Sequence, residues 1–273
     1  MKKYSLFLFS VAVMAFTACS DKKGAQESTG NDTETQNSNA KTAMLEVNET
    51  IPMDEKNPES PQLSIEISLP VIKTGNADAD KRIENRVADV AFQAEESSLT
   101  DAVRNFTNET KEMYHSDKEF YYSMIEDGYG TASFNHSYSI TGEIEKGYKG
   151  YVNYIIHNES YSGGAHPNAA TTAICFDPAT GMEVAVNDIF KEECNKELKE
   201  FIKAVIAEHF DCATFQEVIN NGYLFDNDIY ISNNFILGNE KTVFIYNPYD
   251  IAPYAAGEII VEIPNEKIKH MMK

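Results

Sequence analysis

The sequence is poor in basic residues. It contains 23 Lys and Arg against 43 Asp and Glu, which gives a formal net charge of −20. A protein that binds the phosphate backbone of a nucleic acid needs a basic face, so we expect no nucleic-acid partner. Tryptophan is absent, but 15 Phe and 15 Tyr, with 42% hydrophobic residues among 273, suffice for a sizeable core. A wholly disordered chain is therefore not expected.

Histidine is scarce, and its spacing argues against the common metal sites. No two histidines are three, four or five residues apart, so the usual helical and finger-type pairs of metal ligands are missing. We therefore expect no metal and no cofactor. The six histidines are His115, His136, His157, His166, His209 and His270.

Cysteine is too rare for a disulfide framework, because only Cys175, Cys194 and Cys212 remain beyond the N-terminal region. Cys194 and Cys212 flank an expected helix. If that helix is continuous they lie about 25 Å apart, whereas the Cα atoms of a disulfide approach to about 4.4–6.8 Å. Cys175 could pair with either one, but we expect free, buried thiols.

The N-terminus has the pattern of an export signal. Lys2 and Lys3 precede an apolar run, Leu6 to Phe16, that is shorter than the roughly 20 residues of a membrane-spanning helix. Residues 16–19, Phe-Thr-Ala-Cys, resemble a bacterial lipobox. We expect a signal peptide over 1–18 and diacylation of Cys19, which would anchor an exported protein in the cell envelope, at the periplasmic face or the cell surface. An ordinary cleaved signal is the alternative.

The segment that follows is expected to be a tether. From Ser20 to about Ala43 it is polar and contains no aromatic residue, so it cannot bury enough surface to offset the entropy of ordering. We assign residues 19–58 to a disordered tether. Two modules are expected beyond it, at 59–148 and 149–273.

Hydrophobic periodicity predicts an α+β fold. Residues 62–69 alternate like a half-buried strand, and an apolar stripe over about 78–114 predicts one long helix, or two that break near Ser97-Ser98. Strands are expected to follow over 133–147, 149–161 and 169–177, and a second helix over 193–210. Shorter strand patterns cover 225–237, 242–246 and 257–263. Because strands come in runs, we expect a mainly antiparallel sheet with one long N-terminal helix and one helix of the C-terminal half packed on it.

Three runs of residues carry a family resemblance. They are Gly163-Gly164-Ala165-His166-Pro167, then Asp177-Pro178-Ala179-Thr180-Gly181 with Asp188-Ile189-Phe190, and Ala252-Pro253-Tyr254-Ala255-Ala256-Gly257 near the C-terminus. In this order they resemble the extracellular domain shared by RsiV-type anti-sigma factors and the N-terminal region of PdaC-type peptidoglycan deacetylases. The resemblance covers about residues 60–264.

This resemblance implies a binding role. In the RsiV type the domain is a receptor for lysozyme. We expect no anti-sigma role, because a signal, a lipidation site and a tether precede the domain here. In the PdaC type the hydrolytic domain follows this domain, whereas the sequence here ends at Lys273. We therefore also expect no deacetylase chemistry.

The two loops that resemble the RsiV type are expected to form the recognition end jointly. Gly163 and Gly164 permit a positive φ, and exposed Tyr and Pro side chains suit a protein-binding surface. The expected ligand-binding residues are Tyr161, Ser162, Gly163, Gly164, His166, Pro167, Pro248, Tyr249, Pro253 and Tyr254.

The expected function is non-catalytic binding of a lysozyme-type muramidase or of peptidoglycan. The acidic charge suits a basic protein partner, although it also aids solubility. Two alternatives remain open. One is an enzyme acting on cell-wall glycan with His166 at its centre, and the other is a structural or assembly component of the envelope.

Overall fold

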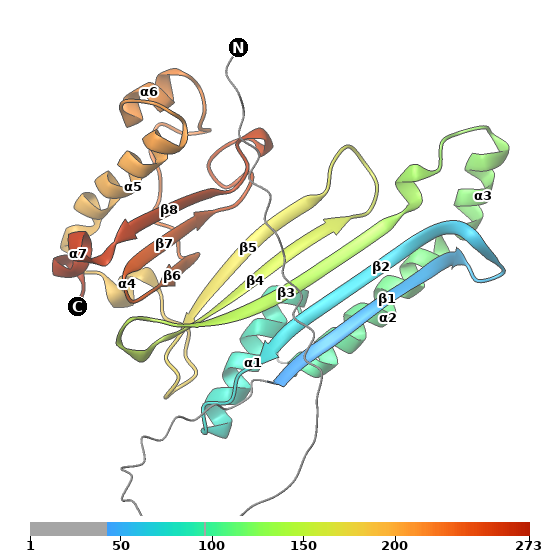
Figure 1. Ribbon diagram of the computed structural model, residues 1–273, viewed down its shortest axis with the longest axis horizontal. Helices are drawn as coiled ribbons and strands as arrows, with labels where there is room; N and C mark the ends of the chain where they lie inside the picture. The colour runs from blue at the N-terminus through green and yellow to red at the C-terminus, as the bar shows by residue number, and fades with distance from the viewer. Residues whose placement is uncertain (1–42, 96) are drawn as a thin grey trace, which may run out of the picture. The chain divides into compact units, whose positions relative to one another are not determined.

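The computed structural model describes residues 43–95 and 97–273 (Figure 1). The expected signal peptide (1–18), Cys19 and residues 20–42 of the expected tether lie outside the described residues. In the described part, no helix is both long enough and apolar enough to cross a membrane.

The expected tether is wrong for residues 43–58, which form a strand, a turn at 55–56 and the start of a second strand. β1 (Ala43–Asp54) pairs antiparallel with β2 (Asn57–Val71). Leu45, Val47 and Ile51 alternate with polar residues in β1 and pack against the first hydrophobic core. That alternation supplies the apolar burial that a tether lacks.

A five-stranded sheet forms one half of the described chain, in the order β1-β2-β3-β4-β5. The pair β2 and β3 is parallel and the other pairs are antiparallel, so the sheet is mixed. It takes strands from both modules expected at 59–148 and 149–273. Its later strands are β3 (His136–Lys146), β4 (Val152–Tyr161) and β5 (Asn168–Phe176).

The helices between β2 and β3 explain the parallel pair, because parallel strands need a crossover connection. They are α1 (Ala77–Phe92), α2 (Leu99–Ser116) and α3 (Lys118–Glu126). α1 and α2 cover one face of the five-stranded sheet (Figure 1). Ile83, Val87 and Val103 of the expected stripe are buried there.

The expected single long N-terminal helix is wrong. Gln93 takes a left-handed conformation, with φ 55°, and ends α1, while the Ser98 side chain accepts a hydrogen bond from the Asp101 N–H and begins α2. A left-handed residue and a serine cap are the usual end and start of helices. The break falls where the alternative of two helices placed it.

A second, three-stranded antiparallel sheet corrects the expectation of one sheet. Its order is β6-β7-β8, and α5 (Asn195–His209), close to the helix expected over 193–210, packs on one of its faces. Its strands are β6 (Phe235–Leu237), β7 (Lys241–Tyr246) and β8 (Ile259–Pro264). Short helices complete this half: α4 (Val186–Ile189), α6 (Phe215–Asn220) and α7 (Asn265–Ile268). Five 3₁₀ turns cover Ala132–Phe134, Tyr148–Gly150, Glu192–Cys194, Tyr254–Ala256 and Lys269–Met271.

Asparagine side chains join the two sheets, because each side-chain amide both accepts a hydrogen bond from the backbone of β5 and donates one to it. The Asn234 amide accepts from the Ala173 N–H at 2.7 Å and donates to the Thr171 carbonyl at 2.7 Å. Asn247 accepts from the Thr171 N–H at 2.8 Å and donates to the same carbonyl at 3.0 Å. These two side chains satisfy the outer edge of β5, where a sixth strand would otherwise pair.

A third asparagine, in the larger sheet, bonds to the backbone of the smaller sheet. Asn153 of β4 is fully buried, and its amide donates to the Leu237 carbonyl at 3.2 Å and accepts from the Leu237 N–H at 3.0 Å. The sheets are further packed through a small apolar cluster that includes Ile155, Val243 and Ile245. Polar bonds and apolar contacts therefore fix the junction together.

The three cysteines of the described part are free, as expected. Cys175 is buried in the second core, and burial raises the pKa of its thiol to about 12. Cys194 and Cys212 are only partly buried. The Cys175 thiol is therefore a packing group and not a nucleophile at neutral pH.

The Asn153 link should be a major determinant of stability. Asn153→Ala leaves the N–H and C=O of Leu237 buried without partners, so we expect the free energy of unfolding to fall by about 2–4 kcal/mol. Denaturant unfolding measures this. Asn108→Ala, at an exposed position of α2, is the control and should change stability by less than about 0.5 kcal/mol. Equal effects of the two substitutions would show that the link is dispensable.

Candidate functional site

The first expected binding loop connects β4 to β5. Gly163 and Gly164 have φ angles of 91° and 106°, which confirms the expected positive φ. A Cβ at Gly163 would lie 3.0 Å from the Ser133 carbonyl oxygen, so this glycine also allows a close approach. The Tyr161 hydroxyl donates to the Gly164 carbonyl at 3.0 Å and braces the loop from within. Ser162 is exposed at its tip.

The second expected loop connects β7 to β8. Its start is fixed by the Asn247 N–H, which donates to a carboxylate oxygen of Asp250 at 2.7 Å. Tyr249 follows with φ 74°, a left-handed conformation that is uncommon for a residue with a side chain, and 58% of it is exposed. Pro253 is exposed and precedes the 3₁₀ turn that begins at Tyr254.

The structure brings the two loops together. The His166 ring stacks on the Tyr254 ring, with centroids 3.8 Å apart and an interplanar angle of 18°. The Tyr254 hydroxyl donates to the Pro167 carbonyl at 2.9 Å, and the Tyr249 ring lies 5.8 Å from that of Tyr254. We call these four residues, His166, Pro167, Tyr249 and Tyr254, the loop junction.

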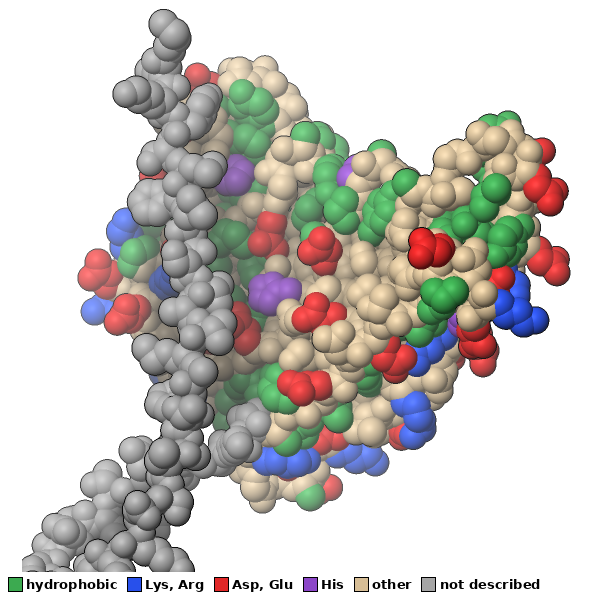
Figure 2. Space-filling view, turned by 45° about the vertical axis from the view of Figure 1, so that its right-hand side comes forward, with side chains coloured by type: hydrophobic (Ala, Val, Ile, Leu, Met, Phe, Trp, Pro, Cys, Tyr) green, Lys and Arg blue, Asp and Glu red, His purple; other side chains and the backbone are tan. Residues whose placement is uncertain are grey.

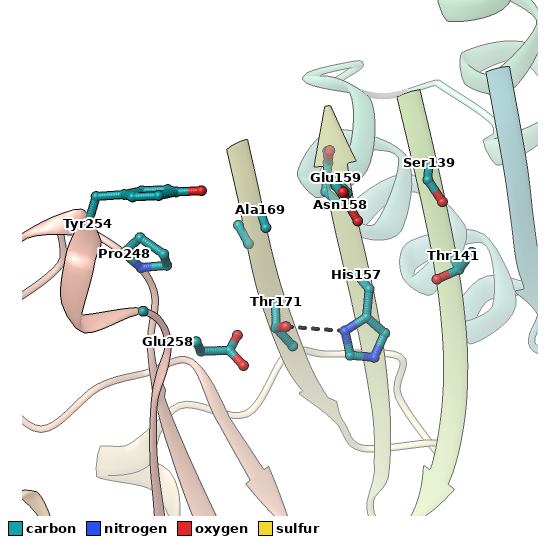
Figure 3. A pocket seen from close by; sticks show the side chains of 12 residues that line it. Ser139, Thr141, His157, Asn158, Glu159, Ala169, Thr171, Pro248, Tyr254 and Glu258 are labelled. Atoms are coloured by element: carbon teal, nitrogen blue, oxygen red, sulfur yellow. Dashed lines mark hydrogen bonds between the residues drawn. The ribbon is translucent and has the colours of Figure 1, made fainter. Parts of the chain in front are cut away.

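The remaining expected residues support the loop junction or lie beside it. Pro248 lines a cavity together with Tyr254 (Figure 3). Tyr161, Gly163 and Gly164 shape the first loop, whereas Ser162 of the first loop and Pro253 of the second are exposed. Of the expected binding residues, the structure thus brings His166, Pro167, Tyr249 and Tyr254 into one cluster.

A cavity of about 460 Å³ lies next to the loop junction, over the face of the five-stranded sheet that α1 and α2 leave open. Tyr254 and Pro248 lie on one side of it, and side chains of β3, β4 and β5 lie on the other (Figure 3). The polar side chains among its lining residues belong to Ser139, Thr141, His157, Asn158, Glu159, Thr171, Tyr254 and Glu258.

His157 is the centre of the polar lining and was not among the expected site residues. Its Nδ1 lies 3.1 Å from the Thr171 hydroxyl, and its Nε2 lies 3.6 Å from a carboxylate oxygen of Glu143. A sequence signal for it existed: the alternation over 149–161 places His157 on the face opposite the apolar core residues Tyr154 and Ile156. His115 and His136, in contrast, line neither of the cavities that His157 lines.

The geometry of His166 suits a fixed surface group. Its Nδ1 lies 2.9 Å from the Pro167 carbonyl oxygen, and its ring is held by the Tyr254 stack. Within residues 43–95 and 97–273 it has no hydrogen bond or ion pair with a carboxylate. In the same residues, no group of three or more His, Cys, Asp or Glu side chains is placed to hold a metal ion.

The stack of the loop junction predicts a specific NMR signature. The Tyr254 ring current should move the His166 ring protons upfield, and Tyr254→Ala should return them to the position of an exposed histidine. Tyr254→Phe is the control, because it keeps the ring and removes only the hydroxyl bond to Pro167. A His166→Gln spectrum identifies the signals. Identical His166 shifts in the wild-type and Tyr254→Ala proteins would show that the loops do not meet in solution.

Residues 187–266 match a family model described as "Protein of unknown function (DUF3298)". The matched span includes the second loop and Glu258, while the first loop precedes it. No curated protein matches the chain.

Two solved structures share the fold. A crystal structure of a member of the DUF3298 family from Bacteroides fragilis is 26% identical, with a TM-score of 0.70, and the match covers 85% of this chain and 92% of that chain. A DUF3298 family protein from Pseudomonas aeruginosa is 13% identical, with a TM-score of 0.55, and the match covers 85% of this chain and 94% of that chain. Residues 187–266 therefore match the DUF3298 family model, and these two structural neighbours are DUF3298 family proteins.

Proposed function

We propose that this protein is a lipid-anchored binding protein of the cell envelope, and that its partner is a basic, lysozyme-type muramidase. The observation that carries the proposal is the loop junction, where two exposed loops far apart in sequence meet beside an acidic face. The motifs in these loops resemble the RsiV type, in which the domain is a lysozyme receptor.

The loop junction has the properties of a protein-binding surface. Tyr249 is largely exposed, and a tyrosine buries a large area on binding at a small cost in side-chain entropy. Its left-handed backbone is held by the bond from its N–H to the Ala252 carbonyl at 3.1 Å. Strained backbone of this kind concentrates at functional sites, so we read it as a means of presenting the ring.

The charge around the junction favours a basic partner. Glu159 and Glu258 line the adjoining cavity, and none of the described residues that line it is Lys or Arg. Figure 2 shows acidic and histidine side chains toward the middle of the face in view, with Lys and Arg at its lower and lateral edges. Such a field attracts cationic proteins and speeds their encounter in a salt-dependent way.

The experiment is a binding titration of the purified full-length protein in detergent with a basic lysozyme. We expect saturable binding that weakens as salt rises. Sedimentation with purified peptidoglycan and turnover of muropeptides are measured in parallel. Binding to peptidoglycan but not to lysozyme would show that peptidoglycan, and not a muramidase, is the ligand. Turnover of muropeptides would favour the enzyme alternative centred on His166. No binding to either lysozyme or peptidoglycan would refute the proposal.

Tyr249→Gly separates binding from stability. Glycine accepts a positive φ, so the unfolding free energy should stay within about 1 kcal/mol of wild type, whereas the lysozyme Kd should rise about tenfold or more because the ring is lost. Lys149→Gly is the matched control, since Lys149 has φ 55° outside the loop junction. It should leave the Kd unchanged. Equal Kd values for both variants would remove Tyr249 from the interface.

The lipid anchor is tested separately. Cys19→Ser removes the thiol that would be acylated, so the protein should shift from the membrane fraction to the soluble or secreted fraction. Metabolic labelling with a fatty acid reports the same step. Unchanged labelling and membrane association in the variant would contradict lipidation at Cys19.

A further inference from the structure

The junction of the two sheets forms a groove that the loop junction does not use. A cavity of about 290 Å³ lies there between the open face of β3–β5 and one face of β7 and β8. It adjoins the larger cavity beneath Tyr254, because His157, Thr171 and Glu258 line both. The two cavities therefore adjoin, and we call the smaller one the groove.

The floor of the groove is apolar. Ile155 of β4 meets Val243 and Ile245 of β7 in the cluster that packs the two sheets together, and Ile236 of β6 packs against it. Ile260 of β8 adds an aliphatic side chain that is 36% exposed. Ile155, Val243 and Ile245 are themselves buried, so Ile236 and Ile260 supply the apolar contact that remains accessible.

The rim of the groove is acidic and only partly neutralised. Glu143, Glu145, Glu258 and Glu262 line it, and Lys241 is the one Lys or Arg among the described residues that do so. Lys241 pairs with Glu262. In the described part of the chain, Glu258 and Glu145 have no hydrogen-bonded or ion-paired side-chain partner, and Glu143 faces only His157.

We propose that this groove takes a Lys or Arg side chain from an extended segment of the basic partner. The aliphatic stem would lie against Ile236 and Ile260, which are partly exposed, and the cationic head would meet Glu143 and Glu258 at the rim. Long basic side chains bury their stems on apolar surface while the charged head finds carboxylates or water. The inference deepens the proposed function and rests on it for the identity of the partner. Two observations favour a basic side chain as the occupant. The rim glutamates would pair with its positive charge, and the groove adjoins the cavity beside the loop junction.

The test measures binding of a tetra-arginine and a tetra-lysine peptide to the full-length protein, with a neutral tetra-glutamine peptide for comparison. The groove pair Glu143→Gln with Glu258→Gln should weaken binding of the basic peptides about tenfold or more. The control pair Glu112→Gln with Glu208→Gln removes the same charge from exposed positions on α2 and α5 and should have less than about a threefold effect. Circular dichroism checks that all variants are folded.

The outcomes separate the two proposals. If the peptides do not bind the wild-type protein, or if both pairs of variants weaken binding equally, the groove is not a site and the inference is overturned. If lysozyme binds the wild type and the groove pair alike, the groove inference fails and the proposed function stands. If lysozyme does not bind but the groove pair alone weakens peptide binding, the lysozyme proposal fails and the basic-segment groove is supported.

Discussion

The hydrogen bonds of three asparagine side chains, together with a small apolar cluster, hold the two sheets against each other. Asn234 and Asn247 complete the edge of β5, and Asn153 pairs with the backbone of β6. An asparagine side chain carries a donor and an acceptor like a peptide group. It can therefore pair with the edge of a strand although no further strand runs alongside that edge. This lets a second sheet begin where the first would otherwise expose unpaired backbone, an arrangement that also protects the edge from pairing with other chains.

The same bonds place the candidate site. Asn247 is bonded to Thr171 and is also the first residue of the second loop, so the loop leaves the sheet beside β5. The first loop ends at the start of β5. Two segments about 85 residues apart in sequence, at His166 and Tyr254, therefore meet and stack. Because the sheets diverge from a packed apolar cluster, the space between them becomes a groove with an apolar floor and polar walls.

The sequence predicts well what depends on local periodicity. The helix of the C-terminal half, the strands flanking it and the faces of β4 follow from the alternation or stripe of apolar residues, because each pattern records which side of one element is buried. The break after Phe92 was one of two open alternatives, since Ser98 is a good cap but the apolar stripe continues across it. Glycine pairs such as Gly163-Gly164 predict a positive φ for a steric reason that needs no partner.

What the sequence could not predict depends on contacts between distant segments. The parallel pairing of β2 with β3 requires knowing where the chain returns after α3. Asn153 lies in a strand that the sequence predicts, but its burial follows only from Leu237 beside it. His157 becomes a site residue only when Glu143, Thr171 and Glu258 surround it. The meeting of the two loops was expected from a family resemblance, not from any pattern in the residues themselves. The pattern does not predict β1, because Glu49 interrupts the alternation of Leu45, Val47, Ile51 and Met53.

Hydrogen–deuterium exchange of the protein with and without a basic lysozyme tests the central claim most directly. That claim is that recognition takes place where the two loops meet over the open face of the larger sheet. We predict slower exchange on binding in the loops at 161–167 and 247–258 and in the neighbouring strands β4 and β5, with α1, α2 and α5 unchanged. Protection confined to those helices, with both loops exchanging as in the free protein, would contradict the account.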